Sequence, residues 1–273
     1  MTLEFTKMHG LGNDFIVIDT ARNRIGDEKL FSSTYCDRRF GIGADQLLLL
    51  DPSDIADFKM RIFNADGSEV EMCGNGIRCI AKYIADKGLS KKKKLAIETL
   101  AGIIYPEISN GQIRVNMGKP RLAPADIPAR FDGDKVLDAP LTLGGTTYSV
   151  TAVSMGNPHC ILFVDDLDNC SITTTGPLIE HCEMFPKRTN VEFVRVLNTS
   201  HLNVRVWERG SGITLACGTG ACAAAVAACL HNRSGRAVTV TLPGGDLFIE
   251  WTDTGDVFMT GPAQTVFHGH IAQ

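Results

Sequence analysis

The amino-acid sequence predicts an α+β protein of two pseudo-symmetric domains that arose by internal duplication. Two similar glycine-rich segments, residues 72–76 (MCGNG) and 216–220 (ACGTG), place Cys73 and Cys217 144 residues apart. The same offset pairs Asn13 with Asn157, Gln46 with Asn190, and Asn64 with Glu208. Short β-branched runs with glycine turns surround one helical segment in each half. We therefore expect each domain to be a curved, mostly antiparallel, barrel-like sheet around a central helix, with the active site in the cleft between the domains.

The strand-like segments of the two halves repeat in this register. Each pair alternates or runs apolar in the manner of a strand that is buried on one or both faces. The matched segments, in chain order, are 12–18 with 156–164, 59–63 with 203–207, and, after a slip of one residue, 97–102 with 240–245.

Each half also contains one clear helix. Apolar residues recur at helical spacing over 77–84, and Gly88 is placed to end this helix as its C′ residue. In the second half, the run 221–230 is rich in alanine and apolar nearly all round. That composition predicts a helix that is buried on most sides.

The domain limits follow from the repeat. The first half extends over residues 1–117 and the second over 118–262, and we expect residues 263–273 to join the first half. Prolines at 120, 124 and 128 mark the crossover, because proline restricts the backbone there.

Composition narrows the class of protein. The chain has 273 residues, of which 44% are hydrophobic and 21% charged, as in ordinary globular proteins. A net charge of −4 argues against nucleic acid as a partner. Residues 1–10 do not resemble a signal peptide, and the apolar run 221–230 is shorter than the roughly 20 residues of a membrane span. We expect a cytoplasmic protein without a membrane partner.

The cysteine pattern argues against both disulfides and a metal. Nine cysteines are an odd number, and in a reducing cytosol we expect free thiols. The closest pairs, Cys73/Cys79 and Cys217/Cys222, lack the C-x-x-C spacing typical of zinc ligands. We predict no metal site.

The surroundings of Cys73 and Cys217 suggest acid/base chemistry. Each cysteine precedes glycines and then a helix, so its thiol should lie at a helix N-terminus, where the dipole favours thiolate and lowers the pKa. The amides of the first turn can bind a carboxylate. Two such thiols facing one substrate could remove a proton from one face and deliver another to the opposite face. This is the chemistry of a two-base racemase or epimerase that needs no pyridoxal phosphate or other cofactor.

Simpler interpretations exist for individual residues. Either glycine-rich segment taken alone could be a structural helix start. His159 could be a hydrogen-bonded structural histidine or a base that acts on one thiol. Glu208 could be a surface carboxylate, an ion-pair partner of Arg205, or a group that tunes the site.

Taken together, these segments resemble the diaminopimelate epimerase family over essentially the whole chain. The matching segments are 10–15, 38–46, 63–68, 72–78, 156–159, 208–210 and 216–220. The resemblance implies an isomerase, independent of pyridoxal phosphate, that interconverts LL- and meso-diaminopimelate in lysine and peptidoglycan precursor biosynthesis. The family commonly forms homodimers. Where some relatives carry a tyrosine linked to the dimer contact, this chain has Phe267.

The resemblance also implies roles for individual residues. Cys73 and Cys217 would be the acid/base pair, assisted by His159 and Glu208. Arg209 would bind the distal carboxylate of the substrate, since a guanidinium can do so with two hydrogen bonds. The backbone amides for the reacting carboxylate would come from Gly74, Asn75, Gly218 and Thr219. The remaining pocket residues would be Asn13, Gln46, Asn64, Asn157, Asn190 and Glu208.

Other functions compete with this one. Proline racemases and hydroxyproline epimerases share the duplication and the paired cysteines but act on compact substrates with a single carboxylate. Phenazine-pathway isomerases are related but lack the cysteine pair. Outside enzymes, Cys73 and Cys217 could form the reversible disulfide of a redox sensor, if the thiols come within bonding distance.

Overall fold

The computed structural model describes residues 2–272, which form two compact units. The first unit combines the chain up to Asn116 with the segment from Thr260 onward, and the second is Met117–Met259. The sequence places the corresponding limits at 117 and 262. Within residues 2–272, no helix is both long and apolar enough to cross a membrane.

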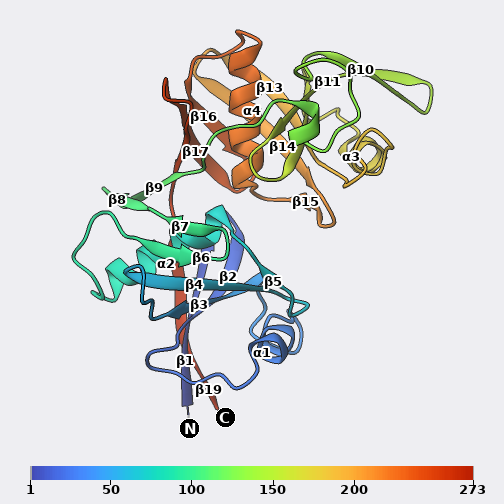
Figure 1. Ribbon diagram of the computed structural model, residues 1–273. Coiled ribbons are helices and arrows are strands. Elements are labelled where there is room, and N and C mark those ends of the chain that lie inside the picture. Colours follow the sequence, from blue (N-terminus) through green and yellow to red (C-terminus); the bar gives the residue numbers. More distant parts are fainter. Residues whose placement is uncertain (1, 273) are drawn as a thin grey trace. The chain divides into compact units, whose positions relative to one another are not determined.

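The first unit holds the N-terminal elements and the last strand of the chain (Figure 1). Its elements are β1 (Thr2–Gly10), β2 (Asn13–Asp19), α1 (Glu28–Tyr35), β3 (Gln46–Asp51), β4 (Phe58–Asn64), β5 (Glu69–Val70), α2 (Gly74–Asp86), β6 (Ile97–Thr99), β7 (Gly102–Ile104), β8 (Glu107–Ser109), β9 (Gln112–Asn116) and β19 (Gln264–Ala272). The strand order is β19-β1-β2-β3-β4-β6-β7, and β5 pairs with β4. Only the pairs β2–β3 and β4–β6 of this sheet are parallel among the described residues. Helix α2 packs against β1 to β4, and α1 packs against β4.

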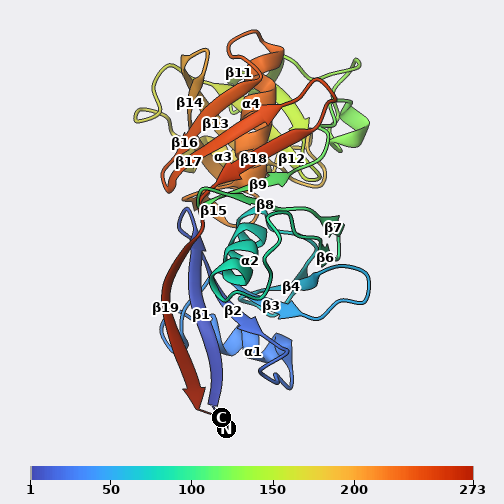
Figure 2. The same cartoon turned by 90° about the vertical axis from the view of Figure 1, so that its left-hand side faces the viewer.

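The second unit repeats this plan. Its elements are η1 (Pro124–Asp126), β10 (Ala139–Leu143), β11 (Thr146–Ser154), β12 (Pro158–Phe163), α3 (Ile172–Glu180), β13 (Asn190–Asn198), β14 (His201–Glu208), β15 (Gly212–Thr214), α4 (Gly218–Leu230), β16 (Ala237–Leu242), β17 (Gly245–Trp251) and β18 (Val257–Gly261). The strand order is β10-β11-β12-β13-β14-β16-β17-β18, and β15 pairs with β14. Helix α4 packs against β11 to β14, β16 and β17, and Figure 2 shows the strands curving around it.

Strand register confirms the internal duplication. In both units the parallel and antiparallel pairings recur at the predicted offset, including the slip of one residue. Equivalent partners are Phe15–Gln46 and His159–Asn190, Leu47–Phe63 and Val191–Trp207, and Lys59–Glu98 and Asn203–Thr241. The predicted fold class is therefore correct, with sheets that are curved but open.

The two central helices match the sequence pattern. The apolar stripe of α2 is buried, and Gly88 follows its C-cap with φ +64°, a conformation that glycine adopts without strain. Helix α4 is buried along most of its length but begins at Gly218, three residues before the predicted run. Its first turn contains glycines and threonine, and therefore lacks the apolar signal that marks the rest of the helix.

Candidate active site

Cys73 caps the N-terminus of α2. Its backbone is extended (φ −138°, ψ 118°), and its Sγ accepts a hydrogen bond from the Gly76 amide at 3.4 Å. A Cβ on Gly76 would lie 3.2 Å from Leu48 Cδ2, so glycine lets this turn approach β3 closely. The thiol lies at the helix N-terminus, as the sequence predicts.

Asn13 at the start of β2 lies next to this thiol. Its Oδ1 accepts a hydrogen bond from Asn75 Nδ2 at 3.2 Å and lies 3.7 Å from Cys73 Sγ. Gln46 and Asn64 face each other across β3 and β4, with Gln46 Nε2 donating to Asn64 Oδ1 at 2.8 Å. The structure thus groups Asn13 with Cys73 and Asn75, and Gln46 with Asn64. We call these residues, with Gly74, the first half-site.

Cys217 caps α4 in the same way. Its backbone is extended (φ −119°, ψ 111°), and its Sγ accepts from the Gly220 amide at 3.3 Å. The Thr219 hydroxyl is 3.5 Å from this sulfur and accepts from Asn157 Nδ2 at 3.3 Å. We call Asn157, His159, Asn190, Glu208, Arg209 and the residues 217–219 the second half-site.

The environment of Cys217 corrects one prediction. The helix N-terminus was expected to lower the thiol pKa, but burial raises the pKa of Cys217 well above its usual value. The carboxylates of Glu208 and Glu192 raise it further, and hydrogen bonds with Thr219 and Gly220 offset only part of the rise. Desolvation therefore outweighs the helix N-terminus in this conformation, and Cys217 is held as a thiol.

His159 belongs to a buried hydrogen-bonded pair that the sequence did not reveal. Its side chain and that of Glu192 are both fully buried, with Nδ1 2.7 Å from Glu192 Oε1. Its Nε2 lies 3.0 Å from Asn157 Oδ1. A Cβ on Gly220 would lie 2.7 Å from Glu192 Oε1, so glycine is needed where α4 meets this pair. The one available signal was a carboxylate in the otherwise apolar run 191–194.

The remaining predicted residues lie around the end of β14. Asn190 Oδ1 accepts from the Arg209 amide at 2.9 Å, and its Nδ2 donates to the Pro158 carbonyl at 2.9 Å. Glu208 Oε1 accepts from the Thr214 hydroxyl at 2.5 Å. The Asn190 side chain therefore links the backbone at the start of β12 to the backbone just after β14. Arg205, which was one alternative ion-pair partner for Glu208, lies 3.7 Å from Asp168.

The exposed guanidinium of Arg209 donates to the Lys187 carbonyl at 3.1 Å. One hydrogen bond uses only part of the donor capacity of a guanidinium, which has five N–H groups.

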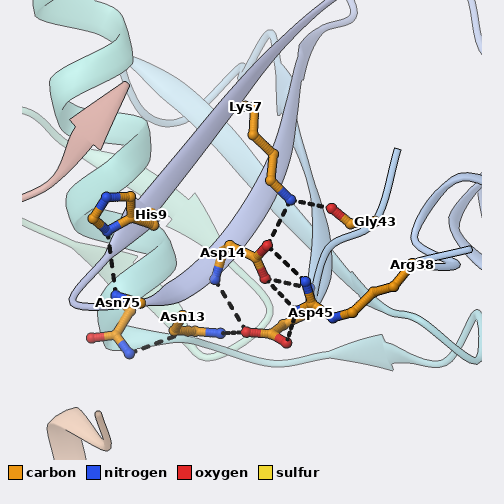
Figure 3. A network of polar contacts seen from close by, with 9 residues as sticks. Lys7, His9, Asn13, Asp14, Arg38, Gly43, Asp45 and Asn75 are labelled. Atoms are coloured by element: carbon orange, nitrogen blue, oxygen red, sulfur yellow. Dashed lines mark hydrogen bonds and ion pairs between the residues drawn. The ribbon is translucent and has the colours of Figure 1, made fainter. Parts of the chain in front are cut away.

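A second network that sequence reasoning missed supports the first half-site (Figure 3). Asp14 lies between Lys7 and Arg38, with 2.7 Å ion pairs to both. Arg38 also pairs with Asp45 at 2.6 Å, and Lys7 donates to the Gly43 carbonyl. Burial alone would raise the pKa of Asp14, but the hydrogen bonds and charges of Arg38 and Lys7 lower it to about 2. Asp14 is thus firmly ionised at neutral pH.

Neither a disulfide nor a metal cluster is present in the described part of the chain. None of the nine cysteines forms a disulfide. No group of three histidine, cysteine or acidic side chains among residues 2–272 is arranged to bind a metal ion.

Comparison with known proteins identifies the family. The model of the diaminopimelate epimerase family matches residues 5–123 and 151–266. The diaminopimelate epimerases of Pelotomaculum thermopropionicum and Synechocystis sp. are each 53% identical to this chain, and the alignments cover 98% of it and 98% and 99% of those proteins. The chain belongs to the diaminopimelate epimerase family.

More distant solved structures share the fold. A PhzF-family phenazine biosynthesis protein from Bacillus anthracis is 17% identical and superposes with a TM-score of 0.73, covering 100% of both chains. A hydroxyproline epimerase from Agrobacterium vitis is 13% identical, with a TM-score of 0.70 over 99% of this chain and 92% of that one. At such identities the likeness extends to the fold alone.

Proposed function

We propose that this protein interconverts LL- and meso-diaminopimelate by a two-base mechanism that uses only its own side chains. The observation that carries the proposal is the pair of cysteines that cap equivalent helices in the two units of a diaminopimelate epimerase family member. As a thiolate, one cysteine removes the α-proton of the substrate. The other, as a thiol, delivers a proton to the opposite face, and the roles exchange in the reverse reaction.

This chemistry requires both half-sites to bind the same substrate molecule. We therefore propose that the two compact units are the two halves of one epimerase, each contributing one thiol. The equivalent register of β2–β4 and β12–β14 supports the proposal, because it gives each thiol the same position relative to its own sheet.

The helix N-termini suit the reacting carboxylate. In each helix the third amide, that of Gly76 or Gly220, donates to the cysteine sulfur. The amides before it, from Gly74 and Asn75 in α2 and from Gly218 and Thr219 in α4, are the proposed donors to the carboxylate. As α-proton removal places charge on that carboxylate, each aimed donor can lower the barrier by about 3–4 kcal/mol.

Other groups suit the rest of the substrate. Gln46 Oε1 is a buried oxygen without a hydrogen-bond partner among the described residues, and we assign it to a substrate ammonium group. Arg209 is assigned to the distal carboxylate, and Asn13, Asn64, Asn157 and Asn190 to the walls of the pocket. His159 and Glu208 would assist the proton transfers, His159 through Asn157 and Glu208 through its effect on the thiol pKa of Cys217.

An isotope experiment tests the proposal directly. Reduced protein is incubated with meso-diaminopimelate in D2O, α-proton loss is followed by NMR, and the isomers are separated on a chiral column. We expect deuterium incorporation together with the LL isomer, and neither product from proline under the same conditions. Absence of exchange from diaminopimelate by the folded, fully reduced protein would contradict the assignment.

We further propose a cytoplasmic location and a homodimer. Nine cysteines that form no disulfide suit a reducing compartment. Within the described residues, β19 pairs with β1 alone, so its outer edge can pair with another strand, and it exposes Val266 (55%) and Phe267 (45%). A second copy of the chain could cover this apolar edge. Light scattering of the wild type and of a Phe267→Lys variant tests the dimer, which we expect to be weaker in the variant.

A further inference from the structure

Asp45 determines which way the Asn13 amide points. Asp45 Oδ2 accepts two hydrogen bonds, from Asn13 Nδ2 at 2.8 Å and from the Asp14 backbone amide at 3.1 Å. Its other oxygen, Oδ1, is ion-paired with Arg38 (Figure 3). A carboxylate in this position can only accept hydrogen bonds, so the amide nitrogen of Asn13 must face Asp45.

The amide oxygen of Asn13 then faces Cys73. This oxygen accepts from Asn75 Nδ2 and lies 3.7 Å from Cys73 Sγ. An amide oxygen has no proton to donate, so it can interact favourably with the sulfur only when Cys73 is a protonated thiol. A thiolate at the same position would face a fixed partial negative charge.

The second half-site lacks this constraint. The position equivalent to Asp45 is occupied by Thr189, whose hydroxyl donates to the Asn190 carbonyl. In the second unit the side-chain amide of Asn157 points the other way. Its nitrogen, Nδ2, faces the segment that follows Cys217 and donates to the Thr219 hydroxyl. The duplicated asparagines thus present an oxygen to Cys73 and an N–H group to the loop of Cys217.

We propose that Asp45 is a positioning residue that acts through Asn13 to hold Cys73 in the protonated, hydrogen-bond-donating form. This role rests on the proposed epimerase function and deepens it, because Cys73 must be a protonated thiol in the direction of the reaction in which Cys217 is the base. Asp14, Lys7 and Arg38 keep Asp45 in place, since Arg38 pairs with both carboxylates and Lys7 with Asp14.

Other ionisable groups also lie near Cys73. Arg78 of α2 donates to the Gly74 carbonyl one residue beyond the cysteine, and Cys79 lies on the same helix. His9 of β1 accepts from the Gly12 amide through Nδ1, at the turn that leads to Asn13. Substitution of Asp45 leaves all of these groups in place, so it tests the orientation of the Asn13 amide separately from them.

The test measures the protonation of Cys73 without requiring turnover. The wild type and Asp45→Asn are alkylated with iodoacetamide between pH 6 and 10, and the peptide containing Cys73 is quantified by mass spectrometry. Once the carboxylate no longer fixes the amide, Asn13 can turn its N–H group toward a thiolate. We expect the midpoint of the alkylation rate of Cys73 against pH to be about one pH unit lower in Asp45→Asn. Below that midpoint, alkylation of Cys73 should then be about tenfold faster than in the wild type.

A double-mutant cycle separates this mechanism from simple loss of charge. In an Asn13→Ala background, Asp45→Asn should leave the profile of Cys73 unchanged, because no amide remains to be oriented. If Asp45→Asn shifted the alkylation midpoint of Cys73 equally in the wild type and in Asn13→Ala, the proposal would be overturned. Only a through-space effect of the Asp45 charge would then remain. No shift in Asp45→Asn alone would also overturn it.

Two further variants complete the design. Asp45→Thr introduces the residue found at the equivalent position of the second unit. It replaces Asp45→Asn if that variant does not fold, and the expected result is the same. Asp86→Asn removes a carboxylate from the C-terminal end of α2, where it pairs with Lys82, and should leave the profile unchanged. Wild-type exchange activity in D2O is scored separately, so failure of the epimerase assignment and failure of the Asp45 role give different results.

Discussion

Replacing Asp14 by asparagine should destabilise the first unit in a pH-dependent way. The Asp14 carboxyl is only 17% exposed and lies between Lys7 and Arg38, which lower its pKa from 3.8 to about 2. By linkage, this shift contributes about 2.5 kcal/mol at pH 7. Because the folded-state pKa is the lower one, the contribution is complete well above pH 3.8 and is lost as the pH falls through 2. At pH 3 about 1.3 kcal/mol remains.

Urea unfolding followed by far-UV circular dichroism measures this effect. We expect Asp14→Asn to lose about 2–3 kcal/mol at pH 7 and about half as much at pH 3. Both tryptophans, Trp207 and Trp251, belong to the second unit, so their fluorescence follows that unit separately. Asp86→Asn, which disrupts an exposed pair with Lys82, should cost less than about 1 kcal/mol at either pH. A loss below about 0.5 kcal/mol at pH 7, or one equally large at pH 3, would refute the reasoning.

Three predictions concern catalysis. Cys73→Ser and Cys217→Ser should each fold but lose epimerisation by several orders of magnitude, and near-wild-type turnover in either variant would rule out the two-base assignment. The rate should show a bell-shaped dependence between about pH 6 and 9, because one thiol and one thiolate are needed together, and a flat profile with chemistry rate-limiting would contradict this. Glu208→Gln should lower the pKa of Cys217, because it removes a negative charge that opposes the thiolate. Alkylation of Cys217 at pH 8 should therefore be faster in this variant, and an unchanged or slower rate would rule out Glu208 as a cause of the raised pKa.

Much of the fold could be predicted from the sequence because the duplication supplies an internal comparison. The offset fixed by the cysteines also fixes the strand register, and the structure reproduces it from β2–β3 to β14–β16. Helices α1 and α3 were not predicted. Helix α1 is short and largely exposed, while α3 contains Pro177 and has no side chain that caps its N-terminus. Such helices depend on tertiary packing, so the local sequence carries only a weak signal for them.

The candidate site was predictable where the two halves agree and not where they differ. The pairing of Cys73 with Cys217, and of Asn13 with Asn157, follows from the offset. The burial of His159 against Glu192 could not be predicted from the offset, since no periodic pattern indicates that two ionisable side chains are fully buried against each other. The direction of the pKa shift of Cys217 was missed for the same reason, because burial depends on packing between distant segments.

The differences between the half-sites matter for catalysis because the two cysteines must be in different protonation states during the reaction. At each turnover one thiol must hold a proton that the other lacks, and two identical half-sites would not distinguish them. The duplicated register locates where they diverge. The buried Glu192 occupies the position of Leu48 in the first unit, and each lies where it would meet a Cβ on the glycine in the first turn of its helix. Conversely, Asp45 stands where the second unit has Thr189. Each unit thus has its own carboxylate near its thiol. Glu192 is buried beside His159, whereas Asp45 is exposed and acts through Asn13. The pKa of each thiol is therefore set by different contacts on one duplicated scaffold.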